Sequence, residues 1–214
     1  RGACIQNCRK TYTVTDKEDG HQFDIDNEYI MSAKDLCTIG FLDQVLDSGV
    51  NILKIEGRGR SPEYVKTTTQ SYREAADAYL EGKYNKEKVK GWINKLESVY
   101  NRSFWDGYYL GQKLGEWTEI HGSKATKKKI YLGKAKNYFT KIQVAEFDLE
   151  TQHLKEGDNI LITGRTTGII ETVAGEIRLN DKQVKSVKKG DNFSMRLDHI
   201  VRPSDKLYKI VNIK

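Results

Sequence analysis

Cysteine is the residue type in this chain best able to bind a transition metal, and the sequence contains Cys4, Cys8 and Cys37. Deprotonated thiols are soft ligands that suit iron–sulfur clusters, and such a cluster is normally held by four of them. Three cysteines do not indicate a disulfide framework, which favours a reducing, cytoplasmic compartment. Three scattered cysteines are also typical of buried, unreactive thiols. The cysteines alone therefore leave open whether they bind a metal or fill the core.

A second candidate site is the stretch Glu56-Gly57-Arg58-Gly59-Arg60-Ser61. It follows a predicted strand over residues 50–56 and precedes a predicted helix, in which Pro62 suits the first position. Free N–H groups at a helix N-terminus attract anions, and arginine binds carboxylate or phosphate through paired hydrogen bonds. We therefore predict a substrate- or anion-binding pocket lined by Glu56, Arg58 and Arg60. The alternative is a solvated turn that contains a Glu–Arg ion pair.

A third candidate is a lysine-rich stretch with aromatic residues between the lysines. Lysines neutralise phosphates, and aromatic rings stack on unpaired bases. We predict RNA binding by Lys127, Lys128, Lys129, Lys134 and Tyr138. The alternative is a solvated edge strand, because lysines on such strands also discourage aggregation.

Peptidase chemistry has little support in the sequence motifs. The chain has no Gly-x-Ser-x-Gly elbow, and its four histidines include no His-Glu-x-x-His spacing for zinc. A dyad of Cys37 with a distant histidine is the remaining possibility for a nucleophile. No pair of residues stands out as catalytic.

Charge divides the chain into two unlike parts. Residues 1–122 contain 17 Lys and Arg against 19 Asp and Glu, whereas residues 123–214 contain 19 against 11, a net charge of +8. Such asymmetry indicates an anionic partner for the basic part. No apolar run approaches the ~18 residues that a membrane span needs, so we expect no membrane partner.

The periodicity of apolar residues differs between the same two parts. The first part predicts strands over 28–31 and 50–56 and helices over 41–46, 62–80 and 86–100, with a loop over 32–37. Successive strand–helix units indicate parallel strands, and two strands cannot complete a parallel sheet, so we expect further strands upstream. The second part predicts seven short strands, typical of an antiparallel barrel or sandwich: 130–133, 141–147, 159–163, 168–173, 175–179, 192–197 and 206–211.

Several segments, in this order and spacing, resemble the collagenase-like peptidase family U32. They are Gly2-Ala3-Cys4-Ile5-Gln6-Asn7-Cys8-Arg9, Met31-Ser32-Ala33-Lys34-Asp35-Leu36-Cys37, Leu53-Lys54-Ile55-Glu56-Gly57-Arg58, and Asn101-Arg102-Ser103-Phe104 with the Gly-Tyr-Tyr that follows. Three later segments are similar to the C-terminal extension of the family: Val144-Ala145-Glu146-Phe147, Lys189-Gly190-Asp191 and Asp205-Lys206-Leu207-Tyr208. The resemblance therefore covers nearly the whole chain.

The resemblance implies an α+β chain. Residues 1–120 would be the C-terminal part of a (β/α) TIM-like barrel, and residues 124–214 a small antiparallel β-barrel similar to domain 2 of translational GTPases. It also implies that Cys4 and Cys37 are ligands of a four-iron four-sulfur cluster completed by upstream residues, and it leaves the role of Cys8 open. The fragment itself is expected to hold no cluster and to be inactive.

For function, the resemblance implies an intact protein that hydroxylates RNA, tRNA above all, with a prephenate-like carboxylate metabolite as a further partner. The alternative is a metal-dependent collagenase-like protease, as the name of the family says. A second alternative is a non-catalytic module that binds RNA or protein.

Overall fold

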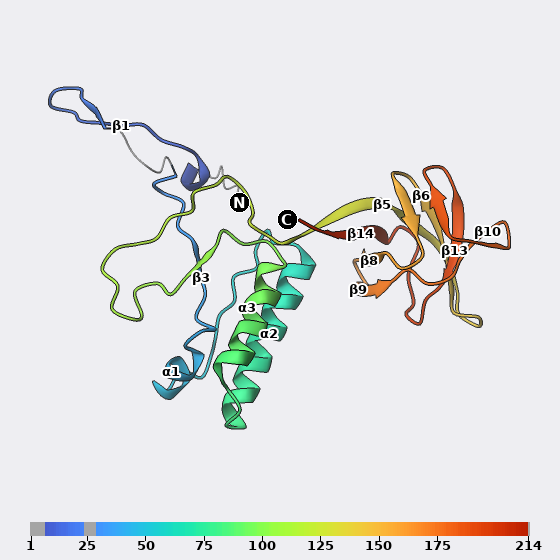
Figure 1. Ribbon diagram of the computed structural model, residues 1–214, viewed down its shortest axis with the longest axis horizontal. Helices are drawn as coiled ribbons and strands as arrows, with labels where there is room; N and C mark the ends of the chain where they lie inside the picture. The colour runs from blue at the N-terminus through green and yellow to red at the C-terminus, as the bar shows by residue number, and fades with distance from the viewer. Residues whose placement is uncertain (1–6, 24–28, 214) are drawn as a thin grey trace. The chain divides into compact units, whose positions relative to one another are not determined.

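The computed structural model describes residues 7–23 and 29–213. The chain divides into two compact units, Arg1–Ala125 and Thr126–Lys214 (Figure 1). The longest elements of the first unit are helices and the second unit is all β, so the mixed α and β content expected from the sequence is confirmed. No helix in the described ranges is long and apolar enough to cross a membrane.

The first unit contains a 3-10 helix, three α-helices and four strands of two residues each. In chain order they are η1 Asn7–Arg9, β1 Val14–Thr15, β2 Gln22–Phe23, β3 Asp35–Leu36, α1 Leu42–Asp47, α2 Pro62–Leu80, α3 Lys86–Glu97 and β4 Phe104–Trp105. The strands pair as β1 with β2, antiparallel, and β3 with β4, parallel.

The three helices lie close to the predicted ranges because their sequences carry clear end signals and an apolar face. Pro62 is at the start of α2, and the Asn85 side chain caps α3 by accepting a hydrogen bond of 3.0 Å from the Lys88 N–H. Small residues of α2 face large apolar residues of α3, which allows the helices to pack closely. The resulting core contains Cys37, Ile39, Leu42, Ala75, Ala78, Trp92 and Leu96.

Both predicted strands of this part are wrong where the structure describes them. Residues 29–31 lie in a turn, and residues 50–56 belong to no strand, with the Ile52 side chain 87% exposed. An apolar run becomes a strand only where a neighbouring strand supplies its backbone hydrogen bonds, and no described segment lies beside residues 50–56 in a ladder. The expected loop over 32–37 instead contains β3. The expected barrel is therefore not confirmed, because parallel pairing in the described residues is limited to β3 and β4.

The second unit is built from ten strands. They are β5 Lys127–Phe139, β6 Val144–Leu149, β7 His153–Lys155, β8 Asn159–Gly164, β9 Gly168–Val173, β10 Ile177–Leu179, β11 Lys182–Val184, β12 Ser186–Lys188, β13 Asn192–Arg196 and β14 Lys206–Asn212. Eight form an antiparallel sheet in the order β11-β10-β13-β6-β5-β14-β8-β9, and β7 pairs with β12. The predicted strands all occur, and the structure adds β7, β11 and β12, of three residues each, which the sequence did not predict.

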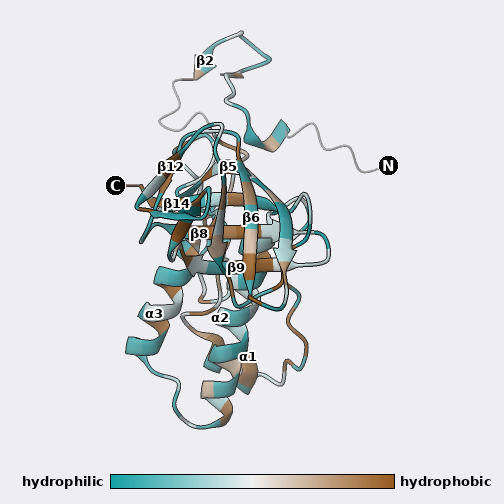
Figure 2. Cartoon of the chain, turned by 90° about the vertical axis from the view of Figure 1, so that its right-hand side faces the viewer, coloured by the Kyte–Doolittle hydropathy of each residue, from teal (hydrophilic) through white to brown (hydrophobic). Residues whose placement is uncertain are grey.

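One hydrophobic core holds the second unit together. Ile170 of β9 belongs to this core, and Val184 of β11 packs against it, although these strands are at opposite ends of the sheet order. The sheet must therefore curl around the core. Hydrophobic positions gather on the strands (Figure 2), and Gly133 of β5 is required because a Cβ atom there would overlap the Asp148 carbonyl oxygen. Likeness to a domain of translational GTPases is not confirmed.

Candidate functional site

The first unit contains a buried ion pair between Asp35 of β3 and Arg102, which precedes β4. The Asp35 N–H donates to the Ser103 carbonyl oxygen at 2.9 Å, and this backbone contact sets the carboxylate beside the arginine. The Arg102 backbone N–H donates to Asp35 Oδ2 at 2.9 Å, while its Nε donates to Oδ1 at 3.0 Å and its Nη2 to the same oxygen. The Asp35 and Arg102 side chains are 21% and 9% exposed, so water screens the pair little.

Further cations act on the Asp35 carboxylate. Burial raises the pKa of the Asp35 carboxyl, and the guanidinium groups of Arg60 and Arg9 oppose that rise. Arg9 also donates to Ser32 Oγ at 3.0 Å. Arg102 Nη1 is buried and makes no hydrogen bond within residues 7–23 and 29–213. Three arginines, Arg9, Arg60 and Arg102, therefore act on the single carboxylate of Asp35.

Cys37 lies two residues beyond Asp35, and its thiol is buried with a relative exposure of 7%. Burial raises the pKa of the Cys37 thiol. The Tyr72 hydroxyl lies 3.9 Å from Cys37 Sγ and accepts a hydrogen bond of 2.9 Å from the Thr38 N–H. In this environment the sulfur is a protonated thiol, which is neither a strong nucleophile nor a metal ligand until it loses its proton.

A small cavity of about 40 Å³ adjoins these groups, with walls that include Asp35, Cys37, Tyr64, Tyr72 and Tyr100. That volume is on the order of the space of one water molecule. The cavity is therefore too small for a carboxylate metabolite. Asp35 and Cys37 both belong to its lining.

The residues predicted to bind an anion have different surroundings. Glu56 and Arg58 are exposed, and Glu56 Oε1 accepts a hydrogen bond of 2.6 Å from the Arg58 backbone N–H. Arg60 instead lies against two rings, with its guanidinium carbon 3.9 Å from the Tyr100 centroid and 5.6 Å from that of Tyr64. The predicted pocket over Glu56, Arg58 and Arg60, and the metabolite it would hold, stay predictions.

The cysteines in the described residues do not gather as a metal cluster requires. Cys4 lies outside the described residues, Cys8 is partly exposed in η1, and Cys37 is buried. Within residues 7–23 and 29–213 no three His, Cys, Asp or Glu side chains come together as metal ligands would.

Of the predicted RNA-binding lysines, Lys127, Lys129 and Lys134 lie on one face of the second unit. Leu132 and Leu207 are fully buried in the core, so Tyr131 and Tyr208 beside them point to the outer face. A β-bulge between Leu207 and Tyr208 places the buried Gly133 opposite Leu207, which returns Lys134 to the outer face. Tyr131 of β5 and Tyr208 of β14 are register partners on that face, with ring centroids 5.6 Å apart. Lys129 Nζ lies 5.2 Å from the Tyr208 centroid.

We call this outer surface the tyrosine–lysine strip and define it as Lys127, Lys129, Tyr131, Lys134, Lys206 and Tyr208. Strand alternation places Lys128 on the opposite side of β5 from Lys127 and Lys129. The Tyr138 ring packs against the core, and its hydroxyl donates to the Leu197 carbonyl oxygen at 2.8 Å, which is a structural role. Lys128 and Tyr138 therefore stand apart from the strip.

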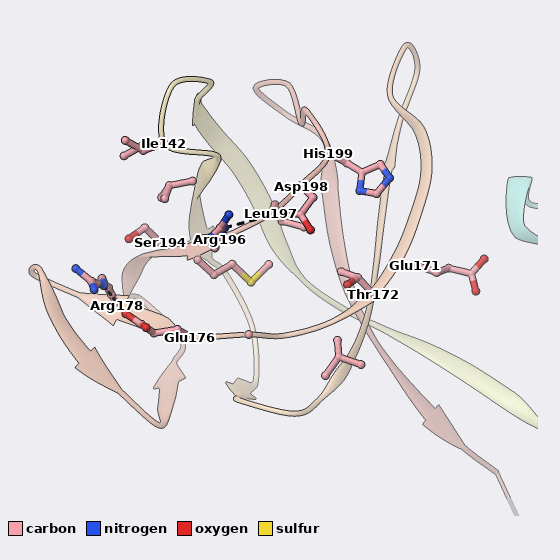
Figure 3. A pocket seen from close by; sticks show the side chains of 14 residues that line it. Ile142, Glu171, Thr172, Glu176, Arg178, Ser194, Arg196, Leu197, Asp198 and His199 are labelled. Atoms are coloured by element: carbon pink, nitrogen blue, oxygen red, sulfur yellow. Dashed lines mark hydrogen bonds and ion pairs between the residues drawn. The ribbon is translucent and has the colours of Figure 1, made fainter.

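A groove of about 760 Å³ crosses another part of the second unit, between β9, β10 and β13 (Figure 3). Its arginines are paired: Arg178 Nε lies 2.6 Å from Glu176 Oε1, and Arg196 Nε lies 3.9 Å from Asp198 Oδ1. Figure 3 shows the Arg178–Glu176 pair at one end of the groove and His199 beside Asp198 towards the other. The paired charges give this surface little net attraction for an anion.

Sequence reasoning missed the roles of several residues that the structure brings together. Asp35 and Arg102 are 67 residues apart, and no local spacing indicates that they form a pair. Tyr131 and Tyr208 are also remote in sequence and meet only through the β5–β14 register. The signal that could have found them was the strand pattern, because each tyrosine lies next to a leucine that fills the core.

Residues 1–119 match peptidase family U32. The chain is 52% identical over 209 residues to a collagenase of Porphyromonas gingivalis strain W83, covering 98% of this chain and 50% of that protein. It is 36% identical over 212 residues to an uncharacterized protease of Methanocaldococcus jannaschii, covering 97% and 51%. It is 30% identical over 190 residues to tRNA hydroxylation protein P1 of Bacillus subtilis, covering 82% and 43%.

The chain thus spans about half the length of the curated relatives that it matches. The residues that match the family include Asp35, Cys37 and Arg102, the three that the first unit brings to one buried cluster. The family resemblance carried by the cysteine and Asp-Leu-Cys segments is confirmed, and this chain belongs to peptidase family U32.

Proposed function

We propose that the intact protein is an RNA-hydroxylating enzyme and that the second unit binds the RNA, with tRNA as the first substrate to test. The observation that carries this proposal is the tyrosine–lysine strip, which lies in the part of the chain with a net charge of +8. Lysines at the surface attract phosphate, and the counterions released from the RNA supply affinity. The name of the Bacillus subtilis relative, which matches 82% of this chain, supports the same class of substrate.

The proposal includes a four-iron four-sulfur cluster in the intact protein, with Cys4 and Cys37 among its ligands. The position of Cys37 supports this, because a buried wall that excludes water suits a cluster ligand. The raised pKa of the Cys37 thiol means that iron binding would have to displace a proton there. No reaction step is assigned to the cluster, since the described residues do not assemble a ligand set.

A collagenase-like protease is the second candidate function, because the Porphyromonas gingivalis relative named collagenase has the higher identity, 52% against 30%. The surroundings of Cys37 argue against a thiol protease. A cysteine nucleophile needs an accessible thiolate, whereas this thiol is buried beside a tyrosine hydroxyl that keeps its own proton. The RNA proposal is therefore preferred.

The binding half of the proposal is tested with the 214-residue chain and unfractionated tRNA. Fluorescence anisotropy at several salt concentrations should show binding that weakens steeply as salt rises, with a log–log slope of about −3 to −5 if about four to six phosphates are neutralised. A chain that shows no binding at low salt would contradict the proposal.

The catalytic half is tested with the full-length protein. Its gene is expressed in a host that lacks hydroxylated tRNA nucleosides, and the host tRNA is digested and analysed by mass spectrometry. A nucleoside heavier by one oxygen atom supports the proposal. Cleavage of denatured collagen by the same pure protein, without any change in tRNA, would favour the protease.

A further inference from the structure

We propose that the tyrosine–lysine strip is a stacking platform for unpaired RNA bases, centred on Tyr131 and Tyr208. This inference rests on the proposed RNA-binding function and specifies the kind of RNA recognised, namely single-stranded segments such as loops and ends. Tyrosine rings stack on bases only where those bases are not already stacked in a duplex. Lysines alone would not distinguish a single strand from a duplex.

The geometry of the strip follows from the pairing of β5 with β14. In register, Tyr208 is opposite Tyr131, Ile210 opposite Lys129, and Lys206 opposite Lys134. The rings of Tyr131 and Tyr208 meet edge to face, with an angle of 66° between their planes. The pair therefore presents two ring surfaces of different orientation, and lysines flank it along both strands.

The core does not require these two rings. Leu132 and Leu207 already fill the interior below the strip, and neither Tyr131 nor Tyr208 belongs to the buried core or to the residues packed on it. Both rings are only partly exposed, and they lie against each other, which limits their movement. A preorganised ring loses little freedom when a base stacks on it.

A shared carboxylate fixes Tyr131. Its hydroxyl donates to Glu150 Oε2 at 2.7 Å, and Lys134 Nζ lies 3.1 Å from Glu150 Oε1. Burial, together with this hydrogen bond, raises the pKa of Tyr131 to about 12. The hydrogen bond to Glu150 holds the orientation of the ring, and the ring is neutral at physiological pH, as a platform for a negatively charged polymer requires.

At Tyr208, an RNA base can replace the ammonium group of Lys129 on the ring. The Lys129 ammonium lies over the Tyr208 ring, in a contact that is weak at exposed sites. Stacking of a base on a ring is generally the stronger interaction. A base that takes this position displaces the ammonium towards the phosphate of the same strand, so one event creates both a stacking contact and an ionic contact.

Two alternative roles for the strip account for fewer of its features. Lysines that protect an edge strand explain the charge but not the two tyrosines between them. The groove of the same unit is a larger surface, but its arginines are paired with Glu176 and Asp198. Binding of a single strand accounts for both residue types, because the bases stack on the tyrosines and the phosphates bind the lysines.

The test measures how tightly the 214-residue chain binds a single-stranded oligoribonucleotide of about eight nucleotides, compared with the same sequence as a duplex. One base is 2-aminopurine, whose fluorescence is quenched when it stacks. The variants are Tyr208→Val and Tyr131→Val, which keep strand propensity. Tyr208→Phe and Tyr131→Phe keep the rings, and Phe139→Val removes an exposed aromatic residue elsewhere on β5.

We expect each valine variant to lose roughly ten-fold in affinity for the single strand, together with the 2-aminopurine quenching, because base–aromatic stacking is worth about that factor or more. Tyr208→Phe and Phe139→Val should bind like the parent chain, and Tyr131→Phe, which keeps the ring but loses its hydrogen bond to Glu150, should lose less affinity than Tyr131→Val. Affinity for the duplex and the slope against salt should not change.

The outcomes separate this inference from the proposed function. If the parent chain binds RNA with a steep salt slope but the valine variants bind both forms like the parent, the platform is refuted and the RNA function remains. Equal losses on single strand and duplex also refute it, since they indicate a general weakening of binding. If the parent chain binds no RNA, both ideas fail. Tyrosine circular dichroism of the phenylalanine variants verifies that the sheet is intact.

Discussion

The buried pair of the first unit and the exposed strip of the second hold charge in opposite ways. Asp35 and Arg102 are largely withdrawn from water and share three hydrogen bonds, so the loss of either one leaves the other buried without its partner. The lysines of the strip are spread over a face supported by a separate hydrophobic core. Loss of a charged group from the Asp35–Arg102 pair should therefore destabilise the first unit. Loss of a lysine from the strip should change binding without changing the stability of the second unit. Substitutions in the two units test that distinction.

The largest effect is expected for Asp35→Ala. Removing the carboxylate leaves the Arg102 guanidinium buried without its partner, which should lower the free energy of unfolding of the first unit by about 3–5 kcal/mol. All three tryptophans, Trp92, Trp105 and Trp117, lie in this unit, so urea unfolding followed by tryptophan fluorescence reports on it alone.

The matched control is Asp77→Ala. Asp77 accepts two hydrogen bonds from Arg73, at 3.0 and 2.6 Å, but the Asp77 and Arg73 side chains are 45% and 72% exposed. Its loss should cost only about 0.3–0.5 kcal/mol, as is usual for an exposed pair on a helix. Equal costs for the two variants would show that burial does not govern the Asp35–Arg102 pair.

The next largest effect is expected for Gly164→Ala, at the end of β8. A Cβ atom there would overlap Asp205 Oδ1, and Asp205 is buried and accepts a hydrogen bond of 2.6 Å from Thr167. Overpacking of this kind should cost about 1–3 kcal/mol and reduce RNA binding only by unfolding the sheet. Gly175→Ala meets no atom within 4 Å and is the control, with near-UV circular dichroism of the tyrosines as the measurement.

A third prediction separates binding from folding in the strip. The double variant Lys127→Gln with Lys129→Gln should reduce the magnitude of the salt slope for single-stranded RNA by about 1.4, at about 0.7 for each phosphate that is no longer neutralised. Stability should change by less than about 0.5 kcal/mol, because the sites are on the surface. Arg178→Gln with Arg196→Gln removes the same charge from the groove and should leave the slope unchanged. A slope that falls equally in both variants would point to overall charge instead of the strip.

The sequence predicted the elements whose signals are local. Pro62, Asn85 and the 3–4 spacing of apolar residues specify the helices, and alternation specifies the longer strands of the second unit. The run over residues 50–56 failed because a parallel strand depends on neighbours that no local pattern reveals. Tyr138 was assigned to RNA from its proximity to lysines, whereas alternation and the Leu197 carbonyl oxygen direct it to the core. Site residues were predictable where a local charge pattern showed them, as for Lys127, Lys129 and Lys134, or where the family resemblance marked their segments.

The smallest effect concerns the pH dependence of the first unit. Burial raises the pKa of Cys37 above its ordinary value of 9.0, so the folded state keeps a proton that the unfolded state loses. This contribution to stability is fully present below the unfolded pKa and is lost as pH rises towards the folded pKa. The free energy of unfolding should therefore fall as pH rises above the ordinary thiol pKa of 9.0, by roughly 1.4 kcal/mol for each unit by which the folded pKa exceeds the unfolded one. Cys37→Ala should flatten that fall, and Cys8→Ala serves as the control. A fall of equal slope in Cys37→Ala would assign the titration to another group, of which Tyr72 is the first to test by Tyr72→Phe, because burial raises its pKa as well.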